Sequence, residues 1–266
     1  MKKIITLLIT YFALARNSYE LLAAKSVDFE TRIIGGHPAF TEQFPFAAAI
    51  EVQTPTSKFF CGGTLYGRQW IITAGQCVDG AILFTIHLGS ISLEKEDSAR
   101  LTLASSQYYL HPEYNAQTLD NDIGLIKLRM AIELTDFIKP IAALAFSDLP
   151  DQSYLRIIGW GQTSDSNPSL ASQLQYVYVS TLSNQECRIT YGNQLTDNMV
   201  CIEGNYNEGS CYGDTGSPLV DVYGKYELVH VGLASFVSGN GCESTDPSGY
   251  TRTYPYVNWI KNITSV

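Results

Sequence analysis

Charged side chains are scarce in this chain of 266 residues, and positively charged ones are the scarcer kind. Only 16% of the residues are charged, and 17 Lys and Arg stand against 26 Asp and Glu, for a net charge of −9. Phosphate backbones and anionic membranes would repel such a protein, so neither nucleic acid nor membrane is expected as a partner. The low charge, together with 45% hydrophobic residues and 21 glycines, favours a secreted β-rich protein.

Long hydrophobic runs are lacking as well. The apolar run from Ile4 to Ala13 is too short to span a membrane, and nothing later reaches that length. Because it follows two lysines and leads into the small-x-small site Ala13-Leu14-Ala15, we predict a signal peptide over residues 1–15, with a buried first helix as the alternative. In the oxidising compartment that export implies, the six cysteines should form three disulfides, whose pairing the spacing alone leaves open.

Short segments with strand character follow one another about every ten residues from Phe44 onward, separated by Gly, Pro, Asn and Asp. In a chain long enough for one large domain or two packed barrels, this spacing predicts an antiparallel all-β barrel or sandwich. Near the C-terminus, Val257, Ile260 and Ile263 recur at helical spacing and predict a short amphipathic helix. The expected strands are 47–53, 59–65, 70–74, 83–88, 99–110, 123–128, 154–159, 174–182 and 226–235.

The most informative stretch is the glycine-rich turn Cys211-Tyr-Gly-Asp-Thr-Gly-Ser-Pro-Leu219. Gly213 and Gly216 permit a tight turn whose N–H groups point into one concavity, and such a concavity binds developing negative charge. Asp214 needs a cation or N–H donors if it is buried, and Thr215 presents a hydroxyl at the apex. These features are typical of a site that handles a negatively charged intermediate.

Further motifs accompany this turn in a fixed order along the chain. They are Ile33-Ile-Gly-Gly, Cys61-Gly-Gly-Thr-Leu, Trp70-Ile-Ile-Thr-Ala-Gly-Gln-Cys77, Asp120-Asn-Asp-Ile-Gly-Leu-Ile, Gly159-Trp-Gly, Gly213-Asp-Thr-Gly and Pro247-Ser-Gly-Tyr-Thr-Arg. The series resembles the chymotrypsin family of trypsin-like serine proteases, and within it the simple layout of insect digestive chymotrypsin-like proteins. The resemblance implies an all-β fold of two packed antiparallel six-stranded barrels with a short C-terminal helix. It also implies an activation propeptide at residues 16–32 and a protease domain at residues 33–266.

The same resemblance implies activation by cleavage. A trypsin-like protease would cut after Arg32, and the new amino group of Ile33 would pair with Asp214, since a buried carboxylate needs such a cation. A disordered linker is the alternative interpretation. The disulfides implied by the family pattern are Cys61–Cys77, Cys187–Cys201 and Cys211–Cys242, each worth about 3 kcal/mol.

The catalytic positions of the family are altered in this chain. Gln76 stands in place of the histidine base, and its amide hydrogen-bonds but takes up no proton near neutral pH. Thr215 stands in place of the nucleophilic serine, whereas Asp122 matches the orienting acid. The oxyanion hole, formed by the N–H groups of Gly213 and Thr215, is main chain and should be retained. Because losing nucleophile and base costs about a million-fold in turnover, we expect no hydrolysis by the usual mechanism.

The specificity pocket, by the same match, has Gly209 at its base, Val237 on its wall and Ser248 at its back. Ser235 matches the family serine that hydrogen-bonds the orienting acid. Without an acid at Gly209, a preference for Lys or Arg is disfavoured, and a neutral pocket accepts apolar or aromatic side chains. Val237 should narrow the entrance. The alternative is that drift has reshaped an unused pocket, since such pockets discriminate by only a few kcal/mol.

Weaker signals add little chemistry. Asn262-Ile-Thr is an N-glycosylation sequon. Glu94, Glu96 and Asp97 cluster where some relatives bind calcium, but their pattern favours a solvated acidic loop. The four histidines are expected to be structural, and we expect neither a metal nor a cofactor.

Our preferred hypothesis is a secreted, monomeric and catalytically inactive serine protease homologue, a pseudoprotease. It would bind polypeptide substrates, protease inhibitors or an active protease, because such binding relies on shape and main-chain contacts that can outlast catalysis. The gut lumen is the expected place, with venom and haemolymph as alternatives. The rival hypothesis is an active endopeptidase of chymotrypsin-like preference that uses Thr215 as nucleophile, and a decayed copy without a role is the third.

Overall fold

The computed structural model describes residues 35–94, 98–150, 152–204, 209–223 and 227–266. The predicted signal peptide and propeptide, and with them Arg32 and Ile33, lie outside these ranges, as do Glu96 and Asp97. No helix within the described ranges is long and apolar enough to cross a membrane.

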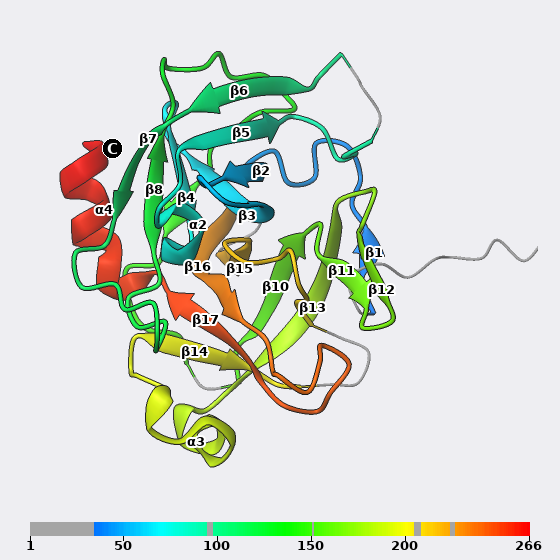
Figure 1. The fold of residues 1–266 in the computed structure, drawn as a ribbon, viewed down its shortest axis with the longest axis vertical. Helices are drawn as coiled ribbons and strands as arrows, with labels where there is room; N and C mark the ends of the chain where they lie inside the picture. Colours follow the sequence, from blue (N-terminus) through cyan, green and yellow to red (C-terminus); the bar gives the residue numbers. More distant parts are fainter. Residues whose placement is uncertain (1–34, 95–97, 151, 205–208, 224–226) are drawn as a thin grey trace, which may run out of the picture. The chain divides into compact units, whose positions relative to one another are not determined.

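The first sheet curls back on itself where the chain bends at Ser106, between two successive strands (Figure 1). Its strands are β2 (Ala47–Gln53), β3 (Lys58–Tyr66), β4 (Trp70–Thr73), β5 (Leu83–Leu88), β6 (Leu101–Ser105), β7 (Gln107–Leu110) and β8 (Gly124–Lys127), in the antiparallel order β6-β5-β2-β3-β4-β8-β7. Ser105 at the end of β6 pairs with Phe84, whereas Gln107 at the start of β7 pairs with Lys127. The Ser105 hydroxyl stabilises this change of partner by donating to the Lys127 carbonyl at 2.6 Å.

The second sheet closes by strand pairing. Its strands are β1 (His37–Pro38), β9 (Ala143–Leu144), β10 (Tyr154–Gly159), β13 (Gln175–Leu182), β14 (Met199–Ile202), β15 (Pro218–Tyr223), β16 (Glu227–Phe236) and β17 (Ser248–Arg252). The order β13-β10-β15-β16-β17-β14 forms a ring because β14 pairs again with β13. β1 joins the outer edge of β13, and β9 pairs with β16 in the parallel direction. A separate hairpin joins β11 (Gln162–Ser164) and β12 (Asn167–Leu170).

These observations confirm the predicted all-β fold of two packed sheets. Of the two predicted barrels, only the second closes through hydrogen-bonded strands, and the first is a curled half-barrel. The reason lies at Ser106, where the predicted strand 99–110 divides into β6 and β7 and exchanges one partner strand for another. The two edges of the first sheet are therefore joined by the chain itself rather than by a further ladder.

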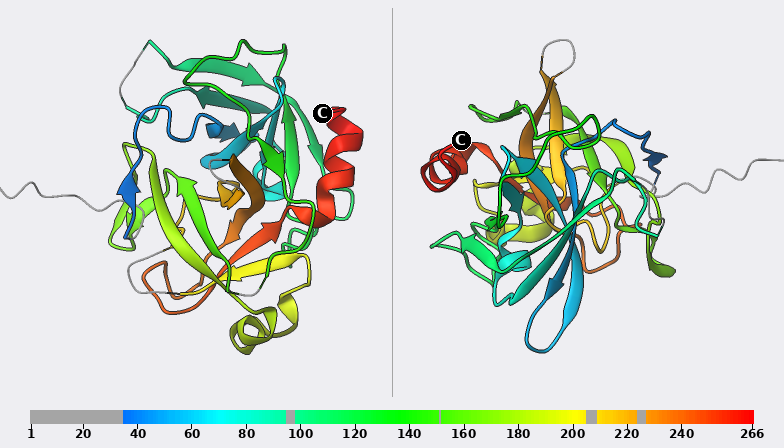
Figure 2. Two further views of the ribbon diagram at one scale, coloured as in Figure 1. Left: turned by 180° about the vertical axis from the view of Figure 1, so that it is seen from behind. Right: turned by 90° about the horizontal axis from the view of Figure 1, so that it is seen from above.

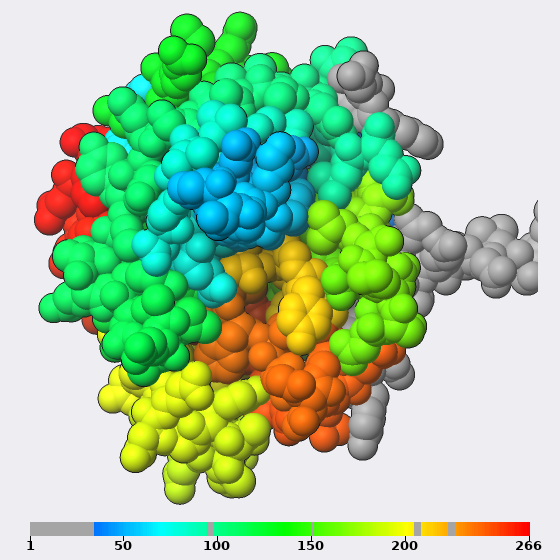
Figure 3. Space-filling view, in the orientation of Figure 1, coloured from blue at the N-terminus to red at the C-terminus, as the bar shows by residue number. Residues whose placement is uncertain are grey.

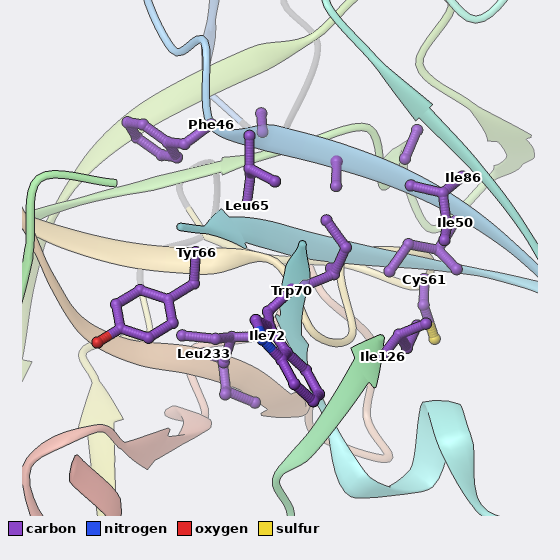
Figure 4. Packing of buried hydrophobic residues seen from close by; sticks show 14 of the residues in the cluster. Phe46, Ile50, Cys61, Leu65, Tyr66, Trp70, Ile72, Ile86, Ile126 and Leu233 are labelled. Carbon is purple, nitrogen blue, oxygen red and sulfur yellow. The ribbon is translucent and has the colours of Figure 1, made fainter. Parts of the chain in front are cut away.

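The hydrophobic core of the first sheet extends into the second. Ile158 of β10 and Leu233 of β16 belong to the same buried cluster as the first-sheet residues, and Figure 4 shows Leu233 among Tyr66, Trp70 and Ile72. A second buried cluster fills the ring of the second sheet. Shared burial of this kind fixes the two sheets against each other, because apolar area at their junction is removed from water.

Five short helical segments complete the described fold (Figure 2). They are α2 (Gly75–Val78), α3 (Asn184–Tyr191) with the 3-10 turn η1 (Gly192–Gln194), and η2 (Tyr254–Tyr256) leading into α4 (Val257–Thr264). The predicted C-terminal helix is α4. Its Ile260 is buried in the first-sheet core, and Tyr66 donates to the carbonyl of Val266 at 3.1 Å, so the chain end returns to the first sheet.

The three disulfides are those that the family pattern implies: Cys61–Cys77, Cys187–Cys201 and Cys211–Cys242. Cys61–Cys77 joins β3 to α2, and Cys211–Cys242 joins the glycine-rich turn to the loop after β16. Two of the three therefore restrain segments beside the site described below.

His230 of β16 is fully buried, and burial lowers the pKa of its imidazole to about 3. Its Nδ1 lies 2.7 Å from the Thr253 hydroxyl, and its Nε2 has no hydrogen-bond partner among the described residues. Between pH 6.5 and pH 3, the imidazole binds a proton in the unfolded chain but not in the folded chain. Stability should therefore fall by about 1.4 kcal/mol per pH unit from this residue alone as the pH drops from 6.5 towards 3.

The measurement is urea unfolding at several pH values, for the natural chain and for His230→Gln. The variant keeps a neutral polar side chain but removes the titration, so its stability should depend less on pH over this range. An identical pH dependence in both proteins would contradict the prediction.

Candidate active site

The glycine-rich turn lies directly against the first sheet. Gly216 has φ +82°, and a Cβ at this position would lie 2.2 Å from Thr73 Oγ1 and 2.5 Å from the Gly62 carbonyl oxygen. Only glycine fits there, because both neighbours are held by other bonds. The Gly62 N–H in turn donates to the Thr215 carbonyl at 2.8 Å. The first sheet thus fixes the turn that carries Thr215.

Two N–H groups at the apex of this turn remain free. The N–H groups of Asp214 and Gly216 donate to the carbonyls of Cys211 and Ala234, at 3.0 and 2.8 Å. Those of Gly213 and Thr215 donate to no acceptor within the described part of the chain. Paired main-chain donors of this kind are what an oxyanion hole offers to a carbonyl oxygen.

Asp214 is fully buried behind the turn. One carboxylate oxygen accepts from the Gly161 N–H at 2.8 Å and the other from the Cys211 N–H at 3.0 Å. Burial raises the pKa of this carboxyl to about 6, against the lowering effect of the two bonds. No Lys, Arg or His forms an ion pair with Asp214 in the described ranges. Ile33, the partner that activation would supply, lies outside them.

Asp122 lies at the centre of a network that joins both sheets. Its Oδ1 accepts from the main-chain N–H of Gln76 at 2.8 Å, and its Oδ2 accepts from the Gln76 side chain at 2.7 Å and the Ser235 hydroxyl at 2.6 Å. Thr251 of β17 donates to the Asp122 carbonyl at 2.9 Å. Burial raises the pKa of the Asp122 carboxyl, and the bonds from Ser235 and Gln76 oppose that rise.

The orientation of the Gln76 amide follows from its neighbours. Nε2 lies 2.7 Å from Asp122 Oδ2 and 2.9 Å from the Ser235 carbonyl oxygen. Both partners only accept hydrogen bonds, so the NH2 group must face them and Oε1 must point away. The amide holds Asp122 as a donor but does not exchange protons near neutral pH. Thr215 is half-buried, and its hydroxyl has no hydrogen-bond partner among the described residues.

A cavity of about 220 Å³ opens beside these residues. Gln76 and Thr215 line it, as do Ser235 and Val237, which the family match places in the specificity pocket. In Figure 3 the surface is hollowed where the gold and orange segments of the second sheet face the cyan segment of the first. The site is thus formed between the two sheets.

Two predicted pocket residues lie outside this lining. Gly209, with φ +152°, precedes the lining residue Ser210, and Ser248 begins β17 opposite Ile202. Sequence reasoning missed Ser210, whose hydroxyl accepts from the Tyr250 hydroxyl at 2.8 Å, and Leu119, which reaches the cavity from a backbone with φ +56°.

The weaker candidates lie apart from the cavity. Asn262 is exposed on α4, and Glu94 is exposed in the loop after β5.

Asp165 lies close to the sulfurs of Cys211 and Cys242, but these are bonded to each other. The Asp165 carboxylate accepts from the N–H groups of Cys242 and Glu243 at 2.8 and 3.0 Å. Asp165 therefore fastens the β11–β12 hairpin to the Cys211–Cys242 loop, and the group makes no metal site.

A two-sheet all-β fold, a turn with two free N–H donors and a buried aspartate facing it define the layout of a chymotrypsin-like serine protease. Residues 33–260 match the family model described as Trypsin, and the chain belongs to this family of serine proteases.

Several relatives match over nearly their whole length. Brachyurin of Leptuca pugilator is 32% identical over 234 residues, which cover 88% of this chain and 99% of that protein. Collagenase of Hypoderma lineatum is 33% identical, with 89% of each chain covered, and Trypsin I-P38 of Gallus gallus is 34% identical, with 89% and 90% covered. The solved structure of HL collagenase superimposes with a TM-score of 0.77 at 30% identity, over 88% of this chain and 99% of that one.

Removing the Ser235 hydroxyl should destabilise the fold. In Ser235→Ala, the buried Asp122 carboxylate loses its shortest hydrogen bond, and a hydrogen bond to a charged group contributes about 1.5–3 kcal/mol. Urea unfolding measures the loss. The matched control is Ser238→Ala, because Ser238 donates at 2.7 Å to Asp246, a carboxylate at the surface. Equal losses in the two variants would contradict a special role for the buried network.

Proposed function

We propose that this protein is a secreted, non-catalytic serine protease homologue that acts by binding polypeptides. The observation that carries the proposal is the Gln76 side chain, which stands beside Asp122 and Thr215 and donates both of its amide hydrogens. A hydroxyl nucleophile needs a base to remove its proton, and an amide does not serve as one near neutral pH. Among the described residues that line the cavity with Thr215, none is a His, Lys or Arg.

What remains at the site supports binding. The cavity, the free N–H groups of Gly213 and Thr215, and the turn that holds them do not depend on the identity of the base. The lining residues carry no charge except for Asp214, which is buried. An apolar side chain with its main-chain carbonyl at the N–H pair is the ligand chemistry that fits. Candidate partners are polypeptides, protease inhibitors and active proteases.

Place and processing belong to the same proposal. The three disulfides and the trypsin-type relatives are consistent with secretion. We further propose that residues 1–15 direct export, that a trypsin-like protease cuts after Arg32, and that the released Ile33 amine supplies the cation for Asp214. The gut lumen is the proposed place of action.

A second candidate is an active endopeptidase that uses Thr215, and the protease names of the relatives favour it. It predicts that an acylating serine-protease reagent labels Thr215, and that Thr215→Ala abolishes the labelling. Mass spectrometry of the Arg32-cleaved protein detects the adduct. Correctly cleaved, folded protein without an adduct would exclude this candidate.

The proposed function is tested by peptide hydrolysis. We expect the Arg32-cleaved natural protein not to cleave peptides with apolar side chains, while Gln76→His/Thr215→Ser cleaves them. The imidazole would take the place of the amide beside Asp122 and supply the base. Loss of the base and the nucleophile lowers the turnover of such an enzyme about a million-fold. Hydrolysis by the natural protein above that of Thr215→Ala would overturn the proposal.

A further inference from the structure

The Gln76 carbonyl oxygen is a free acceptor at the cavity. Its NH2 group is fully used by Asp122 Oδ2 and the Ser235 carbonyl, so Oε1 points to the other side of the amide. No described group donates to Oε1, and it is not among the fully buried atoms without a partner. Because Gln76 lines the cavity together with Thr215, this oxygen is available to a ligand there.

The site therefore offers both the hydrogen-bond donors and the acceptor that one peptide group requires. The free N–H groups of Gly213 and Thr215 donate, and Gln76 Oε1 accepts. A peptide bond presents the complement, a carbonyl oxygen followed by an N–H on the next residue. A neutral histidine at this position would have a free nitrogen that can take up a proton. The amide oxygen of Gln76 takes up no proton near neutral pH and only accepts hydrogen bonds.

Charge decides between an intact chain and a chain end. A C-terminal carboxylate has no following N–H to give to Gln76, and it would add a negative charge near Asp122, which no cation neutralises within the described ranges. An uncut peptide carbonyl is neutral and carries the N–H. The fixed groups of the site thus favour the uncut chain.

We propose that Gln76 recognises an uncut peptide bond in the ligand, with its side-chain oxygen accepting the N–H that follows the carbonyl held by Gly213 and Thr215. The inference rests on the proposed binding function and makes it more specific. The ligand class is an uncut polypeptide with a secondary amide at this point, so proline directly after the bound carbonyl is disfavoured.

The test compares two forms of one probe. Disulfide-cyclised peptides displayed on phage are selected on the Arg32-cleaved protein, and a binder is kept if Val237→Trp, which fills the cavity, abolishes its binding. The bound peptide bond is then replaced by a ketomethylene group, which keeps the carbonyl but replaces the N–H by CH2 and so also removes the planarity of the amide. Calorimetry should show about tenfold weaker binding of the ketomethylene form to the natural protein, as expected for a lost buried hydrogen bond.

A variant of Gln76 provides the matched control. Gln76→Met keeps the length of the side chain but replaces the amide oxygen by a thioether, a much weaker acceptor, so both forms of the probe should bind it almost equally well. Ketomethylene at the next peptide bond should cost the same in both proteins. If Gln76→Met fails to fold, Gln76→Ala takes its place, because the two probe forms must be compared both with and without the side-chain oxygen.

The outcomes separate the two proposals. Equal binding of both probe forms to the natural protein, or an equal loss in Gln76→Met, would overturn the role of Gln76 and leave the binding function standing. If no cavity-dependent peptide can be selected, or if the amide probe is cut, the proposed binding function falls and this inference falls with it.

Discussion

The buried carboxylate of Asp122 is the interaction on which the site depends. Its donors come from α2, which lies between β4 and β5 of the first sheet, through Gln76, and from the second sheet, through Ser235, while Thr251 of the second sheet donates to its carbonyl. A buried charge is costly unless donors surround it, so the two sheets must keep the positions that supply them. The cavity between the sheets takes its geometry from this requirement.

Asp214 is a second buried acid with a different environment. Within the described ranges it accepts hydrogen bonds from two main-chain N–H groups and from no side chain, and burial raises the pKa of its carboxyl to about 6. Above that pH the carboxylate is charged, and among the described residues the two N–H dipoles are what stabilises its charge. The Gly161 N–H comes from the segment after β10, so the glycine-rich turn is connected to the second sheet through Asp214 and to the first through Gly62. Thr215 lies between these two fixed points.

The spacing of short strand-like segments between turn residues predicted several strands well. Strands 47–53, 83–88 and 154–159 agree with β2, β5 and β10 to the residue. It did not predict β14, β15 or β17, whose residues extend only when neighbouring strands supply the pairing that closes the ring. Helix α3 was missed too, although Ser183 and Glu186 form a capping box at its start, a signal that local reading can detect.

The site was predictable where its chemistry lies in local motifs, and it was not where the fold brings in a residue from elsewhere. Gln76, Asp122 and Thr215 each lie in a recognisable stretch, whereas Leu119 reaches the cavity only through an unusual backbone conformation. The sequence showed that Gln76 stands where the family has its histidine base, but it did not show which hydrogen bonds the amide makes instead. An amide and an imidazole both donate to a buried carboxylate, and they differ in what the remaining atom does. The fold needs the donor and catalysis needs the base, so a glutamine can preserve the first while it removes the second.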